Sequence, residues 1–470
     1  MATDIPTSLI IFGATGDLMA KKIAPAIFYL YEHGKLPASF GVVGVSRREM
    51  SDDSFRDLVR GILLKHAHRK VDDRELDRFL DLFTFARVQF EEDAGYEALA
   101  DALRAHERSY GKTNRLLYLA VPPSMFPVIF KHDGFRRIVE EGTVGGVTAR
   151  VIIEKPFGTD GASAKALEAV IEERFNESQV YRVDHYLAKD MLQNIIQFRF
   201  ANNLFEYNWD EDTIESIHIR LWETLGVDRR GAFYDDIGAF RDVGQNHLLE
   251  MLALVTMEKP ETDDAEGFRA KRTSLMHALK AFTQAEAERS TFRAQYAGYR
   301  SIEGVAPDSD VETYYALKTR LDTPRWDGVE VTMESGKRMH EMRKEIVVKF
   351  RAPYQNVVTF RLEPEEEVII DFVSKKPGIL ESGTEKRIFR FGLQDENEER
   401  VQYVAEYGKL ILDAIAGDGK LFLGEEEVEA AWRFTDPIVN AWKKGGIPLH
   451  TYAPDTDEAA IAAAQFFAEK

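Results

Sequence analysis

The sequence predicts a two-domain protein in which a parallel α/β sheet is followed by an α+β domain with a large, mostly antiparallel sheet. Up to about residue 180, short apolar runs alternate with stretches of helical spacing, which is typical of parallel sheets with helices on both faces. Beyond it, several segments alternate apolar and polar residues with few helices between them, as antiparallel strands covered on one side do. We therefore predict domains at residues 1–180 and 181–470.

The first domain contains short apolar runs of strand length. SLIIFG, GVVGVS, RLLYLAVPP and ARVIIEKPFG begin at residues 8, 41, 115 and 149, and a further strand ends near Val183. The apolar spacing predicts a helix over 21–34, and charged helical stretches cover 52–66 and 163–174.

The second domain shows alternating patterns in SIHIRLWET (216–224), VEVTM (329–333), KEIVVKFRA (344–352) and NVVTFRLEPEEEVIIDFVS (356–374). Helical spacing is found over 245–257, 264–287 and 405–415. No repeat and no Gly/Ser-rich or Pro-rich linker accompanies the change of pattern near residue 180.

The composition excludes several classes of protein. A formal net charge of −19 over 470 residues argues against a nucleic-acid binder, whose footprint is normally basic. No apolar run approaches the ~20 residues that span a bilayer, and the first residues do not resemble a signal peptide, so we expect a cytoplasmic protein without membrane contact. The absence of cysteine excludes thiolate catalysis and Cys-based metal sites. Any phosphate site must be a local concentration of cations.

A glycine turn, GATGDL (13–18), stands between the first strand and the first helix, where dinucleotide-binding folds place their phosphate turn. Gly13 permits the tight turn, and Gly16 lets the backbone approach a pyrophosphate. After the second strand the chain carries Arg47 and Arg48. Because an arginine there suits the 2′-phosphate of NADP whereas a carboxylate would bind the ribose of NAD, the sequence favours NADP.

Two groups of charged residues follow later strands. Lys155, in EKPFG, lies just past a strand end, where open α/β sheets bind ligands. In YRVDHYLAKD, Asp184 is a good helix cap, and a helix beginning there would place His185 and Lys189 on one face as an anion site. The alternative for these residues is a cap followed by ordinary surface charges.

His247, in GAFRDVGQNHLLEML, is the second notable histidine. It falls near the start of a predicted helix, where a buried structural histidine is the common alternative. A general base needs a neutral imidazole oriented by a carboxylate, for which Asp184 and Asp242 are candidates. No HExxH or similar arrangement is present, so we expect no metal.

The sequence resembles the glucose-6-phosphate dehydrogenase family. The motifs GATGDLMAKKIAP, YLAVPP, EKPFG, RVDHYLAKD, GAFRDVGQNHLLEML, RAQYAGYR, DSDVETYYALK, RWDGV, SGKRM and LILDAIAGD occur in the family's order over nearly the whole chain. The resemblance implies a Rossmann domain and a second domain whose sheet is used in forming a homodimer or homotetramer. It also implies NADP-dependent oxidation of glucose 6-phosphate at C1 to 6-phosphogluconolactone in the oxidative pentose phosphate pathway, with NAD as a weaker coenzyme.

The resemblance also assigns roles by position. His247 is implied as the general base, with Asp184 orienting it. The implied ligands of the substrate phosphate are His185, Tyr186 and Lys189, and those of the sugar hydroxyls are Glu223, Asp242 and Lys337. Lys155 would lie between the substrate and the nicotinamide, with Lys22 nearby, and Phe126 would help to line the coenzyme cleft. The implied coenzyme residues are Gly13, Thr15, Gly16, Asp17, Leu18, Arg47 and Lys155.

Some positions depart from the family's motifs. Ala188 and Asp190 flank Lys189 where the family commonly has glycine and glutamate, Gly244 takes an apolar position, and Met342 stands where a basic residue is expected. These departures bear on coenzyme preference and affinity more than on reaction type. Two alternatives are an oxidoreductase acting on another sugar or sugar phosphate, and a non-catalytic NADP(H)-binding sensor or scaffold.

Overall fold

The computed structural model describes residues 6–66, 72–143, 146–353, 355–377, 383–393 and 402–470. The chain forms two compact units. The first comprises Met1–Ala188, Thr262–Arg269 and Glu399–Glu425, and the second comprises Lys189–Glu261, Ala270–Glu398 and Glu426–Lys470. The domain division proposed at residue 180 stays a prediction. The first unit runs a few residues beyond it and also includes two later segments that the pattern along the chain does not indicate.

The first unit is built on a seven-stranded sheet with the order β15-β6-β5-β4-β1-β2-β3. Its strands are β1 (Thr7–Phe12), β2 (Phe40–Ser46), β3 (Phe83–Arg87), β4 (Asn114–Leu119), β5 (Ala149–Glu154), β6 (Val180–Val183) and β15 (Phe422–Leu423). The first six pair in parallel, and only β15 joins the edge antiparallel to β6. This confirms the predicted parallel α/β sheet. The strand order reverses direction between β1 and β4, which is where such folds bind dinucleotides.

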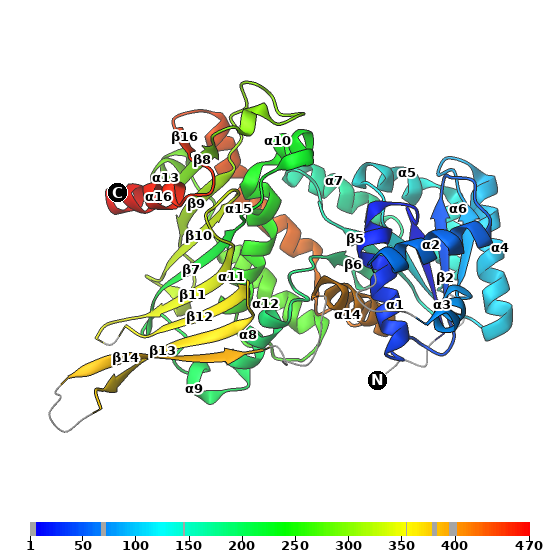
Figure 1. Cartoon of the computed structure of the whole chain (residues 1–470), viewed down its shortest axis with the longest axis horizontal. Helices are drawn as coiled ribbons and strands as arrows, with labels where there is room; N and C mark the ends of the chain where they lie inside the picture. The colour runs from blue at the N-terminus through cyan, green and yellow to red at the C-terminus, as the bar shows by residue number, and fades with distance from the viewer. Residues whose placement is uncertain (1–5, 67–71, 144–145, 354, 378–382, 394–401) are drawn as a thin grey trace. The chain divides into compact units, whose positions relative to one another are not determined.

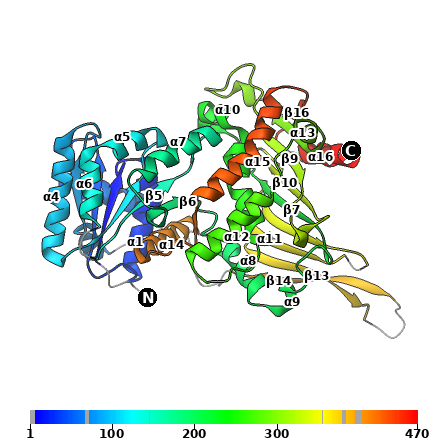
Figure 2. The same ribbon diagram turned by 180° about the vertical axis from the view of Figure 1, so that it is seen from behind.

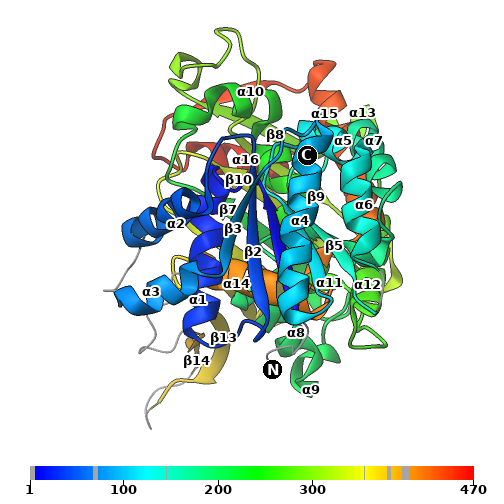
Figure 3. The same ribbon diagram turned by 90° about the vertical axis from the view of Figure 1, so that its right-hand side faces the viewer.

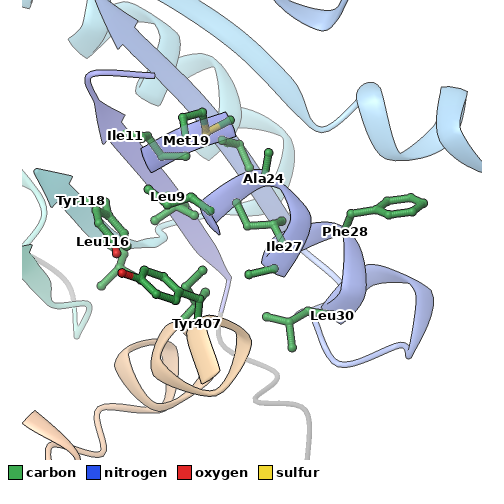
Figure 4. Close-up of a cluster of buried hydrophobic side chains, with 14 of the residues drawn as sticks. Leu9, Ile11, Met19, Ala24, Ile27, Phe28, Leu30, Leu116, Tyr118 and Tyr407 are labelled. Atoms are coloured by element: carbon green, nitrogen blue, oxygen red, sulfur yellow. The ribbon is translucent and has the colours of Figure 1, made fainter. Parts of the chain in front are cut away.

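Helices cover both faces of this sheet, as Figure 3 shows. They are η1 (Met19–Ile23), α1 (Ala24–Glu32), α2 (Asp52–His66), α3 (Asp73–Leu80), α4 (Asp93–Tyr110), α5 (Phe126–Lys131), α6 (Asp133–Glu141), α7 (Gly161–Glu172) and α14 (Gln402–Ala416). On one face, α1 packs against α14, although some 370 residues separate them in the sequence. Leu9, Ile27 and Leu116 are buried in the core below this helix pair, and Figure 4 shows that cluster with Tyr407 of α14 beside it.

The second unit is built on a nine-stranded sheet with the order β14-β13-β12-β11-β7-β10-β9-β8-β16 (Figure 1). Its strands are β7 (Ile214–Trp222), β8 (Thr291–Tyr296), β9 (Tyr314–Thr319), β10 (Glu330–Gly336), β11 (Arg343–Phe350), β12 (Val357–Glu363), β13 (Glu367–Lys375), β14 (Thr384–Gly392) and β16 (Leu449–Tyr452). Six of the eight neighbouring pairs are antiparallel, while β10 pairs with β7 and β16 with β8 in parallel. The predicted antiparallel sheet is confirmed.

The second unit also contains helices, several of which pack against this sheet. They are α8 (Asp190–Phe200), α9 (Asn203–Glu206), α10 (Gly231–Ala239), η5 (Phe240–Leu248), α11 (Leu249–Thr256), α13 (Gln284–Ser290) and α16 (Glu458–Ala468), together with most of α12 (Ala265–Ala278) and α15 (Glu425–Lys443). The helix α8 packs against β12, and η5 packs against β7 and β10, on the side that faces the viewer in Figure 2. Within the described ranges, no helix has both the length and the apolar character needed to cross a membrane.

Candidate active site

The glycine turn after β1 is held between two neighbouring strands. The backbone amides of Gly13 and Ala14 both donate to the carbonyl of Val45 at the end of β2, at 2.9 and 3.1 Å. Gly13 has a φ of +87°, and a Cβ there would lie 2.3 Å from the carbonyl oxygen of Ala120 after β4. Position 13 therefore accepts only glycine without rearrangement. Gly16 is exposed at the start of the helical segment, and its amide donates to the carbonyl of Gly13 at 2.9 Å, which closes the turn.

The end of β2 lies beside this turn. The hydroxyls of Thr15 and Ser46 are 3.0 Å apart, which links the glycine turn to the strand end. Arg47 and Arg48 follow directly and are exposed, whereas Leu18 packs onto the core and Asp17 pairs with Lys21 at 2.7 Å. The turn, the helix start and the two arginines fit a dinucleotide with a 2′-phosphate. Phe126 does not fit its predicted place at a coenzyme cleft, because it is fully buried in the hydrophobic core.

A partly buried carboxyl group that the sequence did not single out, that of Glu154, ends β5. The hydroxyl of Tyr118 donates to Oε1 of Glu154 at 2.6 Å, and Tyr407 of α14 is also hydrogen-bonded to this carboxyl group. Burial raises the pKa of Glu154 to about 7, even though both tyrosines and the charge of Lys155 act in the opposite direction. Lys155 is the next residue, and it is half-buried. Glu154 has no distinguishing sequence signal apart from its position beside that lysine.

The segment after β6 differs from its prediction. The Asp184 carboxylate accepts a hydrogen bond from the amide of Tyr186 at 2.9 Å, and the amide of Leu187 donates to the Asp184 carbonyl at 3.1 Å. These bonds make a local turn, because an aspartate side chain that bonds two residues ahead competes with helix formation. The helix α8 begins only at Asp190, with Lys189 as its N-cap. The predicted helix from Asp184, with its face shared by residues 185 and 189, is therefore wrong.

His185 and Tyr186 nevertheless lie in a cationic and aromatic environment within the first unit. The His185 ring lies 6.5 Å from the Tyr407 ring and 5.1 Å from that of Tyr186. The Nζ of Lys22 lies 5.6 Å from the centre of the Tyr407 ring, a cation–π distance. One lysine and one histidine thus approach the same buried tyrosine.

In the second unit, the register of β7 with β10 brings Glu223 beside Lys337, and η5 adds Asp242. Trp222 of β7 pairs in parallel with Gly336 of β10, so that the next residues, Glu223 and Lys337, leave the sheet side by side. The Nζ of Lys337 is 2.5 Å from Oε2 of Glu223 and 3.8 Å from Oδ2 of Asp242. This group of two carboxylates and one ammonium can donate and accept hydrogen bonds at once, which suits a polyhydroxylated ligand.

His247 lies on η5, a π-helical segment that continues directly into α11. Its backbone amide donates to Oδ1 of Asn246 at 2.7 Å, and the side chain is almost fully buried. Asp242, five residues earlier, lies on the same segment. Single π-helical turns inside helices are frequent at functional sites. The predicted pairing of His247 with Asp184, which belongs to the other unit, stays a prediction.

Lys189 has a partner from a distant part of the sequence. Its Nζ lies 3.3 Å from Oε1 of Glu363 at the end of β12, and the Nζ of Lys344 on β11 lies 2.6 Å from Oε2 of the same carboxylate. Lys189 and Glu363 are 174 residues apart in the chain.

Comparisons with known proteins agree across the chain. The model of the glucose-6-phosphate dehydrogenase NAD binding domain matches residues 10–194, and that of the family's C-terminal domain matches 196–470. Glucose-6-phosphate 1-dehydrogenase of Chlamydia pneumoniae is 36% identical over 94% of this chain and 91% of its own length. The corresponding enzyme of Aggregatibacter actinomycetemcomitans is 36% identical over 95% and 93%.

Solved structures give the same result. A glucose-6-phosphate dehydrogenase in complex with its substrate glucose 6-phosphate superposes with a TM-score of 0.90 at 30% identity, covering 100% of this chain and 99% of the other. Glucose-6-phosphate 1-dehydrogenase from Mycobacterium avium superposes with a TM-score of 0.83 at 30% identity, over 98% and 97%. A levoglucosan dehydrogenase, 13% identical with a TM-score of 0.53, shares the fold.

Proposed function

Because the chain belongs to the glucose-6-phosphate dehydrogenase family, we propose that it oxidises D-glucose 6-phosphate at C1 with NADP. The products are 6-phospho-D-glucono-1,5-lactone and NADPH, as in the first step of the oxidative pentose phosphate pathway. The observation that carries this proposal is the match of the two family models over residues 10–194 and 196–470. The residues that the resemblance assigns to chemistry are all present in the chain.

The reaction needs a base for the C1 hydroxyl proton and an acceptor for the C1 hydride. We assign the base to the neutral imidazole of His247, and we assign Asp184 to orient that ring and stabilise the imidazolium. When NADP is bound, its nicotinamide accepts the hydride with its electron pair. The imidazole and the nicotinamide together account for the proton and the hydride, so the proposal assigns no metal ligands.

The remaining residues bind and orient the substrate. We assign the phosphate to His185, Tyr186 and Lys189, and the sugar hydroxyls to the cluster of Glu223, Asp242 and Lys337. Phosphate binding far from C1 provides binding energy that can hold C1 against the hydride acceptor. Lys155, at the carboxyl end of β5, would lie between the sugar and the nicotinamide.

Preference for NADP over NAD is part of the proposal. The exposed Arg47 and Arg48 follow β2, where a 2′-phosphate is recognised in such folds, and no carboxylate stands at either position. Gly13, Thr15 and Gly16 would form the pyrophosphate turn, with Asp17 and Leu18 opening the helix. NAD remains the weaker alternative coenzyme.

We also propose that the protein is a homo-oligomer. Phe372 of β13 and Phe389 and Phe391 of the edge strand β14 are 44 to 54% exposed, and the register of the two strands places all three on one face. An exposed apolar face on an edge hairpin is suited to pairing with a second copy. Sedimentation velocity is expected to give a dimer or tetramer, and a monomer at micromolar concentration would contradict this part.

A cytoplasmic location completes the proposal. It is supported by the composition and by one relative, 34% identical over 95% of the chain, whose name places it in the cytoplasm of Arabidopsis thaliana.

Steady-state kinetics test the proposed substrate and coenzyme. With the purified protein, kcat/KM for NADPH formation is expected to be at least about 10³-fold higher with glucose 6-phosphate than with glucose, because only the former engages the cationic residues. With glucose 6-phosphate fixed, NADP is expected to give the higher kcat/KM than NAD. Preferred turnover of glucose or of another phosphosugar would support a different sugar oxidoreductase. Coenzyme binding without turnover would support a sensor or scaffold.

A further inference from the structure

Two lysines of the second unit share one carboxylate. Glu363 ends β12, and its two oxygens are divided between Lys189, at 3.3 Å, and Lys344, at 2.6 Å. Lys344 lies directly opposite Glu363 in the antiparallel pairing of β11 and β12, so the strand register fixes this contact. The side chains of Lys189, Lys344 and Glu363 are only 5, 12 and 17% exposed, which limits screening by solvent.

Glu363 is ionised at neutral pH. Burial by itself would raise the pKa of this carboxyl group, but the charges and hydrogen bonds of Lys344 and Lys189 outweigh burial and lower the pKa. The three side chains therefore carry one positive charge in excess. A glutamine at position 363 would leave an excess of two, which matches the charge of a phosphate dianion.

We propose that Glu363 is a specificity-determining residue that acts as an internal anion at Lys189 and weakens the binding of phosphate-bearing substrates. The inference rests on the proposed role of Lys189 as a ligand of the substrate phosphate. A phosphate that approaches Lys189 meets a carboxylate already paired with that lysine, and like charges in a partly buried site repel strongly. Lys344 offsets part of this repulsion by holding the other carboxylate oxygen.

The matched substitution is Glu363→Gln, which removes the charge and keeps the shape. Isothermal titration calorimetry with inorganic phosphate at constant ionic strength measures the anion site without turnover. We expect the Kd for phosphate and the KM for glucose 6-phosphate to fall about tenfold, as expected when one like charge is removed from a partly solvated site. The kcat and the KM for NADP are expected to stay within about twofold, because the change acts on binding of the phosphate group.

Glu215→Gln is the control. Glu215 pairs with Lys349 at 2.9 Å between β7 and β11 of the same sheet, and both side chains are 38% exposed. The control removes the same charge from the same unit. Its Kd for phosphate and its KM for glucose 6-phosphate are expected to match those of the parent. A general effect of net charge would instead shift both variants alike and overturn the assignment to Glu363.

Phosphate binding by Glu363→Gln that equals or falls below that of the parent would overturn the proposal, because it would make Glu363 a support that holds Lys189 in place. If this variant does not fold, the Lys344→Met variant tests the proposal instead. That change leaves the carboxylate to Lys189 alone and is expected to raise the Kd for phosphate about tenfold, whereas an unchanged Kd contradicts the proposal. Calorimetry requires no reaction. If no NADPH is formed, the proposed function is contradicted, but the effect of Glu363 on the Kd for phosphate can still be measured.

Discussion

Replacing His247 with asparagine is expected to lower kcat by about 10²–10⁴-fold, the range that a positioned general base contributes. Asparagine is polar and fits within the volume of the buried ring, so the fold should be kept, but its amide cannot accept the proton of the C1 hydroxyl. The KM for glucose 6-phosphate is expected to change only a few-fold, because the lost interaction belongs to the transition state. Initial-rate measurements with saturating NADP give both constants.

His277→Asn is the control for this substitution. His277 is an exposed histidine of α12, and its replacement removes an imidazole without touching the proposed site. We expect kcat within twofold of the parent, and a melting temperature within a few degrees for both variants. A His247→Asn enzyme with parental kcat would exclude His247 as the base.

Replacing Gly13 with alanine is expected to disable coenzyme binding and to destabilise the first unit. A Cβ at position 13 would lie 2.3 Å from the carbonyl oxygen of Ala120, and this backbone cannot withdraw easily because the Ala120 amide is bonded to Phe12 at 2.9 Å. Strain at a φ of +87° adds to the clash. We expect a loss of about 2–4 kcal/mol in unfolding free energy and a rise of about 100-fold or more in the KM for NADP. Chemical denaturation and kinetics measure the two effects.

Gly111→Ala separates the clash from the backbone strain. Gly111 ends α4 with a similar φ of +83°, is exposed, and has no atom within 4 Å of the position its Cβ would take. This variant is expected to lose stability through strain alone and to keep the parental KM for NADP. Parental NADP binding by Gly13→Ala would show that the turn does not approach the coenzyme.

Local patterns were sufficient to predict most of the parallel sheet. The runs at residues 8–13, 41–46 and 149–158 are short, apolar and flanked by glycine or charge, and each became a strand. The strand β3 was missed, because FTFAR lies between helices without an apolar run of its own. In the second unit β8, β9, β14 and β16 were missed, since their strand character depends on neighbours that are distant in the sequence.

The sequence also did not predict that α14 and β15 belong to the first unit. An amphipathic helix carries information about its buried face but none about which domain it covers. The turn after β6 was wrongly predicted as a helix, because the Asp184 carboxylate can cap either structure and bonds to its own second neighbour here.

The site residues that belong to local motifs could be predicted from the sequence. The partners that reach them from distant parts of the chain could not. Glu223 and Lys337 were predicted from the family's motifs, and the parallel pairing of β7 with β10 explains why they meet. The partners of Glu154 and Lys189 were not predicted, because Tyr407 and Glu363 reach them only through tertiary structure. Contacts between residues distant in the sequence produce no periodic pattern from which they could be predicted.

The most direct test of the central claim uses glucose 6-phosphate labelled with deuterium at C1. After reaction with NADP, mass spectrometry of the reduced coenzyme is expected to show one deuterium per molecule, and the 6-phosphogluconate formed on hydrolysis of the lactone should have lost it. This result would establish hydride transfer from C1 to the nicotinamide. Reduced coenzyme without deuterium, or no reduced coenzyme at all, would contradict the proposed reaction.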